Sequence, residues 1–435
     1  MLLKLQNHID KNLSFLKGKK LLLALSGGID SMVLLHLLKQ LHFDISAAHC
    51  NFNLRGQESD GDEAFVKSIC DNSEIKLFVN HFNTKEYADL HKLSIQVAAR
   101  QLRYDWFNEV LEKYGFDYLL TAHHLDDSIE TFLINFTRGT GLEGQTGIPE
   151  RNDKIVRPLL IFSRGEIETY ANENAIQWRE DSSNTSDKYL RNKLRHSVIP
   201  ILKELNPGFL HSFQQTLENL QQAQSMVDDA SRIVYRKVVE DVNFQKRIHL
   251  SELMILPNYQ AYLYQWLKPF GFTAWEDIYD LVEAQSGKQI FSGKYRLLKD
   301  REVLILEELS THDSASYFIE ENQTETEFPV VLKMTYVTNV TALQDDSVIF
   351  VDKDTLKFPL VFRKWQEGDY FYPFGMDGKK KVSKYFKDEK FSLIDKEKAW
   401  LLCSGNDIVW IVGKRADRRF SVTKTTQTII KIELK

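Results

Sequence analysis

The sequence predicts an α/β domain with a doubly wound parallel sheet, followed by a mainly helical middle domain and a β-rich C-terminal domain. From Leu21 to about Asp117, short apolar runs alternate with helix-like stretches, as the strands and crossover helices of a parallel sheet do. Residues 209–286 are rich in Gln, Leu and Glu and indicate helices, whereas β-like segments dominate from about Ser292 onward. The predicted domains are residues 1–207, 208–312 and 313–435.

The elements of the first domain follow in chain order. The expected strands are LLLAL (21–25), DISAAHC (44–50), IKLFVN (75–80) and DYLLTA (117–122). The helix-like stretches that follow them span residues 30–41, from about 58 onward, 95–114 and 126–137. Another helix is predicted to start at Ser163, because Glu166 three residues later completes a capping-box signature. In the last part, YRLLKD (295–300) and EVLILEE (302–308) predict a hairpin, and TQTIIKIEL (426–434) predicts a final strand.

The composition is that of an ordinary globular protein, with 43% hydrophobic and 27% charged residues in 435. No run approaches the roughly 18 consecutive apolar residues of a membrane span, and no signal-peptide core opens the chain. Cys50, Cys70 and Cys403 form no CxxC pair, so neither a disulfide framework nor a metal knuckle is expected. These features predict a cytoplasmic protein with no membrane partner.

Charge is distributed unevenly along the chain. Residues 361–435 hold 17 Lys and Arg against 10 Asp and Glu, although the whole chain has a net charge of −5. The basic clusters are KKKVSKYFKDEK, with Lys380, Lys381 and Lys384, and KRADRR, with Arg415. A basic end on an acidic chain predicts a local anionic partner, and a merely solvated surface is the alternative.

The hexapeptide SGGIDS (26–31) directly follows the first predicted strand. Gly27 and Gly28 let a ligand approach the backbone, and the helix start that follows offers free N–H groups. Ser26 and Ser31 add hydroxyl donors. The stretch matches neither GxxxxGK[ST] nor GxGxxG, so a Walker A loop is excluded and dinucleotide binding is weakly supported. The pattern favours a phosphate site, and an ordinary tight turn is the alternative.

Polar side chains follow the other predicted strands too. His49 ends the second strand, and the pair His123–His124 follows the fourth. Ligands of doubly wound sheets bind at the carboxyl ends of the strands, so these residues are expected to gather near the loop. His123 and Asp127 share one helix face if that helix starts early enough. Asp30 and Asp127 are candidate Mg²⁺ ligands, and helix-start carboxylates are the alternative reading of both.

SGGIDS after an apolar strand resembles the pyrophosphate-binding loop of the N-type ATP pyrophosphatases, which cleave ATP between its α- and β-phosphates and adenylate a carbonyl oxygen. Further stretches narrow the resemblance to the long form of the tRNA(Ile)-lysidine synthetases. They are HCNFNLRGQESDGDE (49–63), AARQLRYDWF (98–107), TAHHLDDSIETFLINFTRGTGLEGQTGIP (121–149), RPLLIFSRGEI (157–167), EDSSNTSDKYLRNKLRHSVIPIL (180–202) and RKWQEGDYFYPFGMDGKKKVSKYFKD (363–388). The match is dense over residues 20–205, and it implies an adenine nucleotide α-hydrolase-like fold. In the family's HxxHGLR stretch, Phe52 and Asn53 replace the second His and the Gly, so no role of that His carries over.

The resemblance implies a ligase that forms a carbon–nitrogen bond in two steps. ATP first adenylates C2, through its carbonyl oxygen, of the wobble cytidine in a tRNA(Ile) with a CAU anticodon. The ε-amine of free L-lysine then displaces AMP and gives lysidine. ATP is therefore the expected co-substrate and Mg²⁺ the expected ion, and homodimer formation is left open.

Roles for individual residues carry over at the matching positions. The catalytic candidates are Asp127, His123, Arg100 and Arg191. The ATP-binding candidates are Ser26, Gly27, Gly28, Asp30, Ser31 and His49. The tRNA-binding candidates are Arg195, Lys380, Lys381, Lys384 and Arg415. Asp127 holds Mg²⁺, or it positions lysine and accepts a proton from an amine that is protonated at pH 7. The lysine site is left open between Glu130 and Asp181.

Three other functions fit parts of the pattern. Thiolation of a tRNA cytidine uses the same kind of loop with a CxxC pair, which this chain lacks. A glutamine-dependent synthetase brings an amidotransferase part, of which the C-terminal half shows no signature. A non-catalytic RNA-binding protein does not need the intact SGGIDS, HxxxD and RNKLR set.

Overall fold

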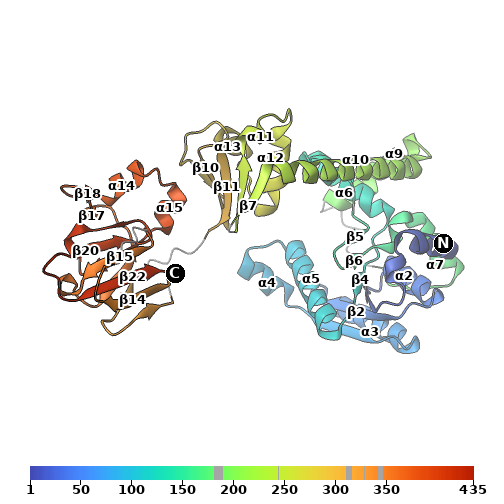
Figure 1. The fold of residues 1–435 in the computed structure, drawn as a ribbon. Helices are drawn as coiled ribbons and strands as arrows, with labels where there is room; N and C mark the ends of the chain where they lie inside the picture. The colour runs from blue at the N-terminus through green and yellow to red at the C-terminus, as the bar shows by residue number, and fades with distance from the viewer. Residues whose placement is uncertain (181–189, 243, 310–315, 328, 341–345) are drawn as a thin grey trace. The chain divides into compact units, whose positions relative to one another are not determined.

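The computed structural model describes residues 1–180, 190–242, 244–309, 316–327, 329–340 and 346–435 (Figure 1). The chain forms two compact units, Met1–Asp229 and Ala230–Lys435. The predicted boundary between residues 312 and 313 lies outside the described residues. In the described part of the chain, no helix is long and apolar enough to cross a membrane.

The first unit contains a six-stranded sheet with the strand order β3-β2-β1-β4-β6-β5. Its strands are β1 (Leu21–Ala24), β2 (Ile45–Asn51), β3 (Leu77–His81), β4 (Tyr118–Leu120), β5 (Arg151–Asn152) and β6 (Ile155–Val156). All neighbours pair in parallel except β5 and β6. The four predicted strands are thus confirmed. The chain continues from β1 to β2 on one side and returns to β4 on the other, which creates a switch point at the carboxyl ends of β1 and β4.

Both faces of this sheet are covered by helices, which explains why its central strand is apolar throughout. Leu21 and Leu23 of β1 belong to one buried cluster, which also holds residues of α1, α2, α3 and α7. Leu22 belongs to the opposite cluster, with Phe107 and Leu111 of α5. The helices are α1 (Leu2–Asn12), α2 (Ile29–Gln40), α3 (Gln57–Asn72), α4 (Thr84–His91), α5 (Ile95–Tyr114), α6 (Leu125–Arg138), α7 (Arg164–Glu173), α8 (Leu190–Lys193), a π-helical turn (Leu194–Val198), α9 (Ile199–Leu205) and α10 (Phe209–Val238).

The second unit begins with an antiparallel sheet of order β7-β8-β11-β10-β9. Its strands are β7 (Val239–Val242), β8 (Gln245–His249), β9 (Gln289–Phe291), β10 (Tyr295–Asp300) and β11 (Val303–Glu308), and its helices are α11 (Leu250–Leu253), α12 (Tyr259–Leu267) and α13 (Trp275–Leu281). The predicted hairpin is β10–β11. Strands β7 and β8 were not expected in this largely helical region. They are short and charged, and pairing of β8 with β11, including Ile248 opposite Leu304, stabilises them.

The C-terminal part of the second unit is β-rich, as predicted. One sheet has the order β12-β16-β19-β20-β21 and another has the order β13-β14-β22-β15, beside the small pair β17-β18. A buried cluster joins Phe362 and Trp410 of the first sheet to Ile349 and Ile432 of the second. The elements are β12 (Tyr317–Ile319), β13 (Glu325–Thr326), β14 (Leu332–Val337), β15 (Val348–Asp352), β16 (Leu360–Lys364), β17 (Tyr370–Phe371), β18 (Lys380–Lys381), α14 (Val382–Asp388), α15 (Leu393–Lys398), β19 (Trp400–Ser404), β20 (Asp407–Ile411), β21 (Arg415–Ala416) and β22 (Ile429–Leu434).

Candidate active site

The SGGIDS loop joins β1 to α2 at the switch point of the sheet. Gly27 has a φ of +88°, and a Cβ there would lie 3.2 Å from Val66 Cγ2, so glycine is required. Ser26 Oγ accepts a hydrogen bond from the Gly28 N–H at 3.3 Å and lies 3.1 Å from Ser31 Oγ. Ser31 Oγ donates to the Gly28 carbonyl oxygen at 2.9 Å. The hydroxyls therefore fold the loop, and the first-turn amides of α2, which have no acceptors within the helix, are groups that can bind an anion.

His49 and Arg179 form hydrogen bonds with main-chain carbonyl groups in and next to this loop. His49 is buried, and its Nδ1 lies 2.9 Å from the carbonyl oxygen of Leu25, the residue that precedes the loop. Burial lowers the pKa of His49, so its ring is neutral and donates from Nδ1. The Arg179 N–H donates to the Gly27 carbonyl oxygen at 3.0 Å, and Arg179 Nε bonds Asp62 at 2.6 Å. The predicted ATP-binding residue His49 thus acts on the loop through the main chain. Arg179 was missed because a main-chain contact leaves no signal in a sequence.

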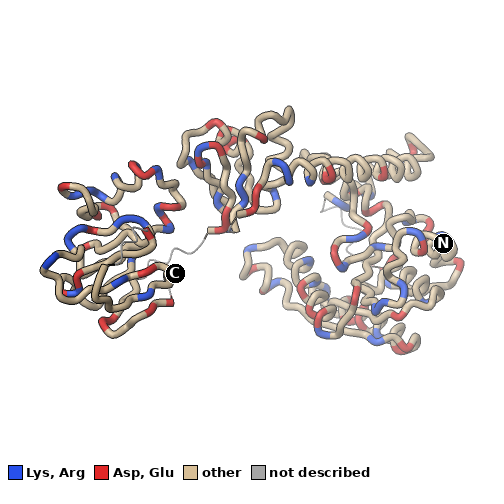
Figure 2. Tube along the Cα trace, viewed as in Figure 1, with Lys and Arg blue, Asp and Glu red and all other residues tan. Residues whose placement is uncertain are grey.

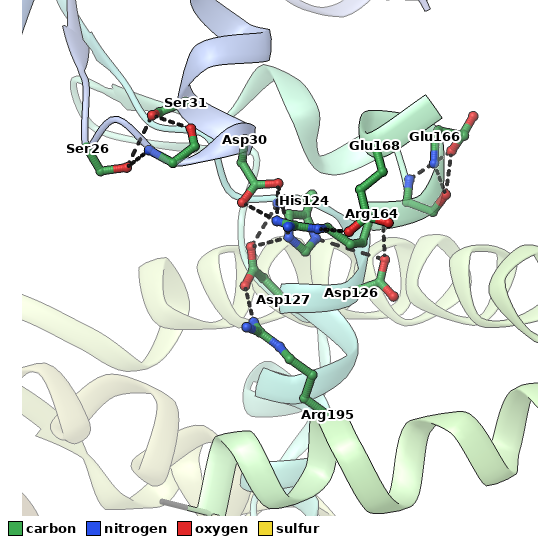
Figure 3. Close-up of polar contacts among 12 residues, drawn as sticks. Ser26, Asp30, Ser31, His124, Asp126, Asp127, Arg164, Glu166, Glu168 and Arg195 are labelled. Carbon is green, nitrogen blue, oxygen red and sulfur yellow. Dashed lines mark hydrogen bonds and ion pairs between the residues drawn. The ribbon is translucent and has the colours of Figure 1, made fainter. Parts of the chain in front are cut away.

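The two candidate Mg²⁺ ligands face the same histidine (Figure 3). His124 Nε2 lies 3.7 Å from Asp30 Oδ1 and 3.6 Å from Asp127 Oδ2. Both oxygens of Asp30 also accept hydrogen bonds from Arg164 Nη1, at 2.9 and 2.8 Å. Burial raises the pKa of Asp30, although the charges of His124 and Arg164 oppose this effect. His124 was expected at this edge of the sheet as part of the pair His123–His124, but it was not assigned a role. Arg164 was not among the predicted site residues, and only its place in a quoted stretch pointed to it.

Helix α6 begins at Leu125 with His124 as its N-cap, so His123 precedes the helix. The condition for a shared helix face of His123 and Asp127 is therefore not met. Asp127 Oδ2 accepts a hydrogen bond from the His124 N–H at 3.0 Å, which is the helix-start role weighed as its alternative. His123 Nδ1 instead pairs with Thr121 Oγ1 at 2.9 Å. Burial is the main cause that lowers the pKa of His123 to about 4, and the charge of Asp127 opposes it.

Arg191 and Arg195 converge on the buried carboxylate of Glu130, each with its Nε 2.6 Å from a Glu130 oxygen. Asp127 Oδ1 lies 3.4 Å from Arg191 Nη2 and 3.6 Å from Arg195 Nη2. Burial alone would raise the pKa of Asp127, but the charges of His124 and Arg191 lead a set of influences that lower it. Asp127 is thus a fixed anion. Glu130, one of the two lysine-site alternatives, is engaged by both arginines, and Asp181 lies outside the described residues.

The site also contains two further arginines, Arg100 and the buried Arg157. Arg157 was not predicted from the sequence. The Arg100 guanidinium lies over the Tyr104 ring, 4.9 Å from its centroid. Arg157 is 5% exposed, its Nη1 donates to the Pro149 carbonyl oxygen at 2.6 Å, and its Nε has no partner among the described residues. Burial lowers the pKa of Arg157, and the charge of Arg100 adds to that. The charges of Arg100, Arg157 and Arg191 all help to lower the pKa of His123.

The donor set fits a magnesium ion. Asp30 and Asp127 offer carboxylate oxygens on two sides of one ring nitrogen, and Mg²⁺ is commonly held by one or two carboxylates together with substrate phosphates. The described residues contain no group of three or more His, Cys, Asp or Glu that could hold a metal without substrate. The arrangement suits transfer of a nucleotidyl group, because it joins phosphate-binding amides, carboxylates and arginines at one sheet edge.

The low pKa of His123 gives a testable pH dependence of stability. As pH falls from 6.5 toward about 4, the unfolded chain protonates this ring and the folded chain does not, so stability is lost over that window. Between pH 7 and pH 4.5, the free energy of unfolding of the wild type, measured with urea, is expected to fall by about 2 kcal/mol more than that of His123→Asn. Equal losses in the two proteins would contradict the neutral, buried state of His123.

The predicted tRNA-binding lysines lie around α14 in the second unit, where Lys and Arg alternate with acidic residues (Figure 2). Lys381 and Lys384 are exposed. Lys380 is 17% exposed and pairs with Asp388 at 2.8 Å, so its charge is already balanced. Arg415 is exposed and donates to the Phe374 carbonyl oxygen at 2.8 Å. Arg195, predicted for tRNA, lies instead beside Asp127 in the first unit.

Three family models and one solved structure resemble parts of this chain. A family model described as a PP-loop domain matches residues 1–202, a TilS substrate binding domain matches 241–309, and a TilS substrate C-terminal domain matches 360–434. Among solved structures, the U34-tRNA thiolase NcsA from Methanococcus maripaludis is 22% identical, with a TM-score of 0.43, and the match covers 51% of this chain and 79% of that chain.

Two curated relatives match nearly end to end. The tRNA(Ile)-lysidine synthase of Bacteroides thetaiotaomicron is 39% identical over 429 residues, covering 97% of each chain. That of Porphyromonas gingivalis strain W83 is 37% identical over 434 residues, covering 95% of this chain and 94% of the relative. Together with a Gly-Gly loop that leads into a helix beside two carboxylates at the switch point of the sheet, this similarity shows that the chain belongs to the tRNA(Ile)-lysidine synthase family.

Proposed function

We propose that this chain converts the wobble cytidine of a CAU-anticodon tRNA(Ile) to lysidine, using ATP and free L-lysine and releasing AMP and pyrophosphate. The observation that carries the proposal is the SGGIDS loop, folded by its own hydroxyls with the amides of α2 open to an anion. Asp30 lies in the first turn of α2 and shares His124 with Asp127, and Arg164 and Arg191 pair with these two carboxylates. Cleavage of ATP needs helix-start amides, carboxylates and arginines together at one site.

In the first step the cytidine O2 attacks the α-phosphorus, and pyrophosphate leaves. The α2 amides, Ser26 and Ser31 bind the departing phosphates, and Arg100 and Arg191 stabilise the charge that builds on the α-phosphate. Asp30 and Asp127 would hold Mg²⁺, which offsets phosphate charge when bound. Asp30 pairs with Arg164 at 2.8 Å, and this cationic partner supports the proposal that Asp30 is ionised.

In the second step the lysine amine attacks C2 and AMP leaves. A lysine ammonium must lose a proton before it can attack. The lowered pKa of Asp127 makes it a weak base and a lasting anion, which favours a role in holding Mg²⁺ or the ammonium group over a role as proton acceptor. His123 is neutral at physiological pH and can orient a substrate group through its ring without adding charge.

Further partners belong to the same proposal. Lys381, Lys384 and Arg415 are exposed and suit phosphates of the tRNA backbone.

The division into domains at 1–207, 208–312 and 313–435 stays a proposal. So does the cytoplasmic location, which three unpaired cysteines support. A homodimer stays a prediction that light scattering of the purified chain tests.

The proposed function is tested by mixing the purified chain with ATP, Mg²⁺, radiolabelled lysine and an unmodified CAU-anticodon tRNA(Ile) transcript. Acid-precipitable label and AMP are followed together, with an elongator methionine tRNA of the same anticodon as the control. We expect equal amounts of lysine incorporation and AMP on tRNA(Ile) only. AMP without lysine incorporation would keep the ATP chemistry and refute lysine as the nucleophile, and no signal from folded protein would refute both.

A further inference from the structure

Arg164, the first residue of α7, holds one of the two proposed Mg²⁺ ligands (Figure 3). Its Nη1 donates to both carboxylate oxygens of Asp30, at 2.9 and 2.8 Å. Mg²⁺ requires near-octahedral geometry, with oxygen ligands at about 2.0–2.1 Å. A guanidinium nitrogen that bridges both oxygens therefore stands where an ion bound to Asp30 would lie, so the two cations compete for that carboxylate.

Arg164 also balances negative charge at this point. Asp30 and Asp127 approach the same ring nitrogen, His124 Nε2, to 3.7 and 3.6 Å, so two carboxylates converge there. Burial is the main cause that raises the pKa of Asp30, and the charge of Asp127 adds to it. The charges of His124 and Arg164 lower that pKa. Arg164 thus contributes positive charge of the kind that Mg²⁺ would bring.

The Arg164 side chain has a second anchor that is independent of Asp30. Its Nε donates to Glu168 Oε1, one turn later in α7, at 2.7 Å. The side chain is 40% exposed, so a ligand from solvent can reach the guanidinium. The Arg164 main-chain N–H is bound separately to Asp126 Oδ2 at 2.8 Å. The guanidinium therefore stays attached to its own helix when Nη1 exchanges one acceptor for another.

A phosphate of ATP is an acceptor of the same kind as the Asp30 carboxylate. Guanidinium groups pair with carboxylates and with phosphates through the same bidentate hydrogen bonds. Asp30 lies in the first turn of α2, whose amides are proposed to bind the departing phosphates. A guanidinium that leaves Asp30 is thus already beside the proposed phosphate position.

We propose that Arg164 exchanges partners when ATP binds, leaving Asp30 to Mg²⁺ and pairing with a phosphate of ATP. The inference rests on the proposed function, because it requires ATP and Mg²⁺ at this site. The exchange makes the nucleotide and the ion bind cooperatively, since each one takes a partner that the other sets free. A fixed ion pair that only fastens α7 to α2 would give no such cooperativity.

Mn²⁺ binding, measured by electron paramagnetic resonance, tests the exchange without any turnover. The wild type is compared with Arg164→Gln, each with and without an ATP analogue that has a methylene group between its α- and β-phosphates. Without the analogue, the variant is expected to bind Mn²⁺ about three- to tenfold more tightly, because the competing cation is gone. By calorimetry with Mn²⁺ present, it is expected to bind the analogue about tenfold more weakly, because a charge-assisted bond to phosphate is lost.

Two control variants assign these effects, and thermal melting of each variant establishes that it folds. Asp30→Asn combined with Arg164→Gln should abolish the gain in Mn²⁺ binding, because the gain requires the Asp30 carboxylate. Lys4→Gln removes another cation that pairs with α7, at Glu166 with a distance of 3.1 Å, and it should change neither affinity.

The exchange would be overturned if Arg164→Gln gained no Mn²⁺ affinity, if the gain persisted without the Asp30 carboxylate, or if the analogue bound as tightly as it does to the wild type. A wild type that binds the analogue but forms no lysidine would overturn the proposed function instead.

Discussion

Asp127→Asn is expected to lower the rate of lysidine formation by about a thousandfold or more, because one preorganised charge at such a site contributes about that much. The substitution removes the charge with little loss of shape. The amide oxygen can still accept the His124 N–H, so the start of α6 is kept. Arg191 and Arg195 keep their bonds to Glu130. Single-turnover rates with saturating ATP and tRNA measure the effect, and the Tm should change little.

The neighbouring Asp126 provides a matched control. It is also buried with a lowered pKa, although burial itself acts in the opposite direction. Its Oδ1 pairs with Lys203 at 2.7 Å, and its Oδ2 accepts the Arg164 N–H at 2.8 Å and lies 3.9 Å from His124 Nδ1, the ring nitrogen that does not face Asp30 or Asp127. Asp126→Asn is therefore expected to cost stability and to leave the rate within about tenfold of wild type. Equal rate losses in the two variants would refute a specific role for Asp127.

The dependence on Mg²⁺ separates the two roles left for Asp127. If Asp127 holds the ion, Asp127→Asn needs a higher Mg²⁺ concentration, and excess Mg²⁺ recovers part of the rate. If Asp127 holds lysine instead, the substitution raises the KM for lysine. Because the pKa of Asp127 is lowered, its titration should leave no step in the rate profile between pH 6 and 9. Such a step, lost in the variant, would favour the proton-acceptor role.

The architecture around the site was predictable from local pattern. Apolar strands alternate with amphipathic helices, and polar residues stand where each strand ends, so SGGIDS, His49 and the pair His123–His124 were expected at one sheet edge. The structure brings Asp30 and Asp127 to the same His124 nitrogen. Strands β7 and β8 escaped prediction because tertiary pairing with β11, rather than local preference, stabilises them.

The partners of each side chain were not predictable, because they come from distant parts of the chain. Asp30 pairs with Arg164, 134 positions away, and Glu130 meets Arg195, 65 positions away. Such pairs have no period that a single sequence can reveal. Whether His123 and Asp127 share a helix face depended on where α6 starts, and helix ends are the least certain feature of a periodic pattern. The start at Leu125 places His124 between the two carboxylates.

The two loop glycines should fail in different ways when each is changed to alanine. Gly27 has a left-handed φ, and a Cβ added there would lie 3.2 Å from Val66 Cγ2. Gly27→Ala is therefore expected to lower the free energy of unfolding by about 1–2 kcal/mol, even without ATP. Gly28 has a φ of −75°, which any residue adopts, and a Cβ there would meet only Ser26 Oγ, at 3.5 Å. The folded chain therefore has room for Gly28→Ala.

That room is where the phosphates of ATP are proposed to lie, against the first turn of α2. Gly28→Ala should therefore keep a Tm near that of the wild type and raise the KM for ATP about a hundredfold, since a displacement near 1 Å costs about that much. Thermal melting without ATP and AMP release as a function of ATP concentration measure the two effects. If Gly28→Ala used ATP normally, the phosphates would have to bind elsewhere, and the helix-start amides would lose their proposed role. Instability without ATP in Gly27→Ala alone, and weak ATP use in Gly28→Ala alone, would separate folding of the loop from its chemistry.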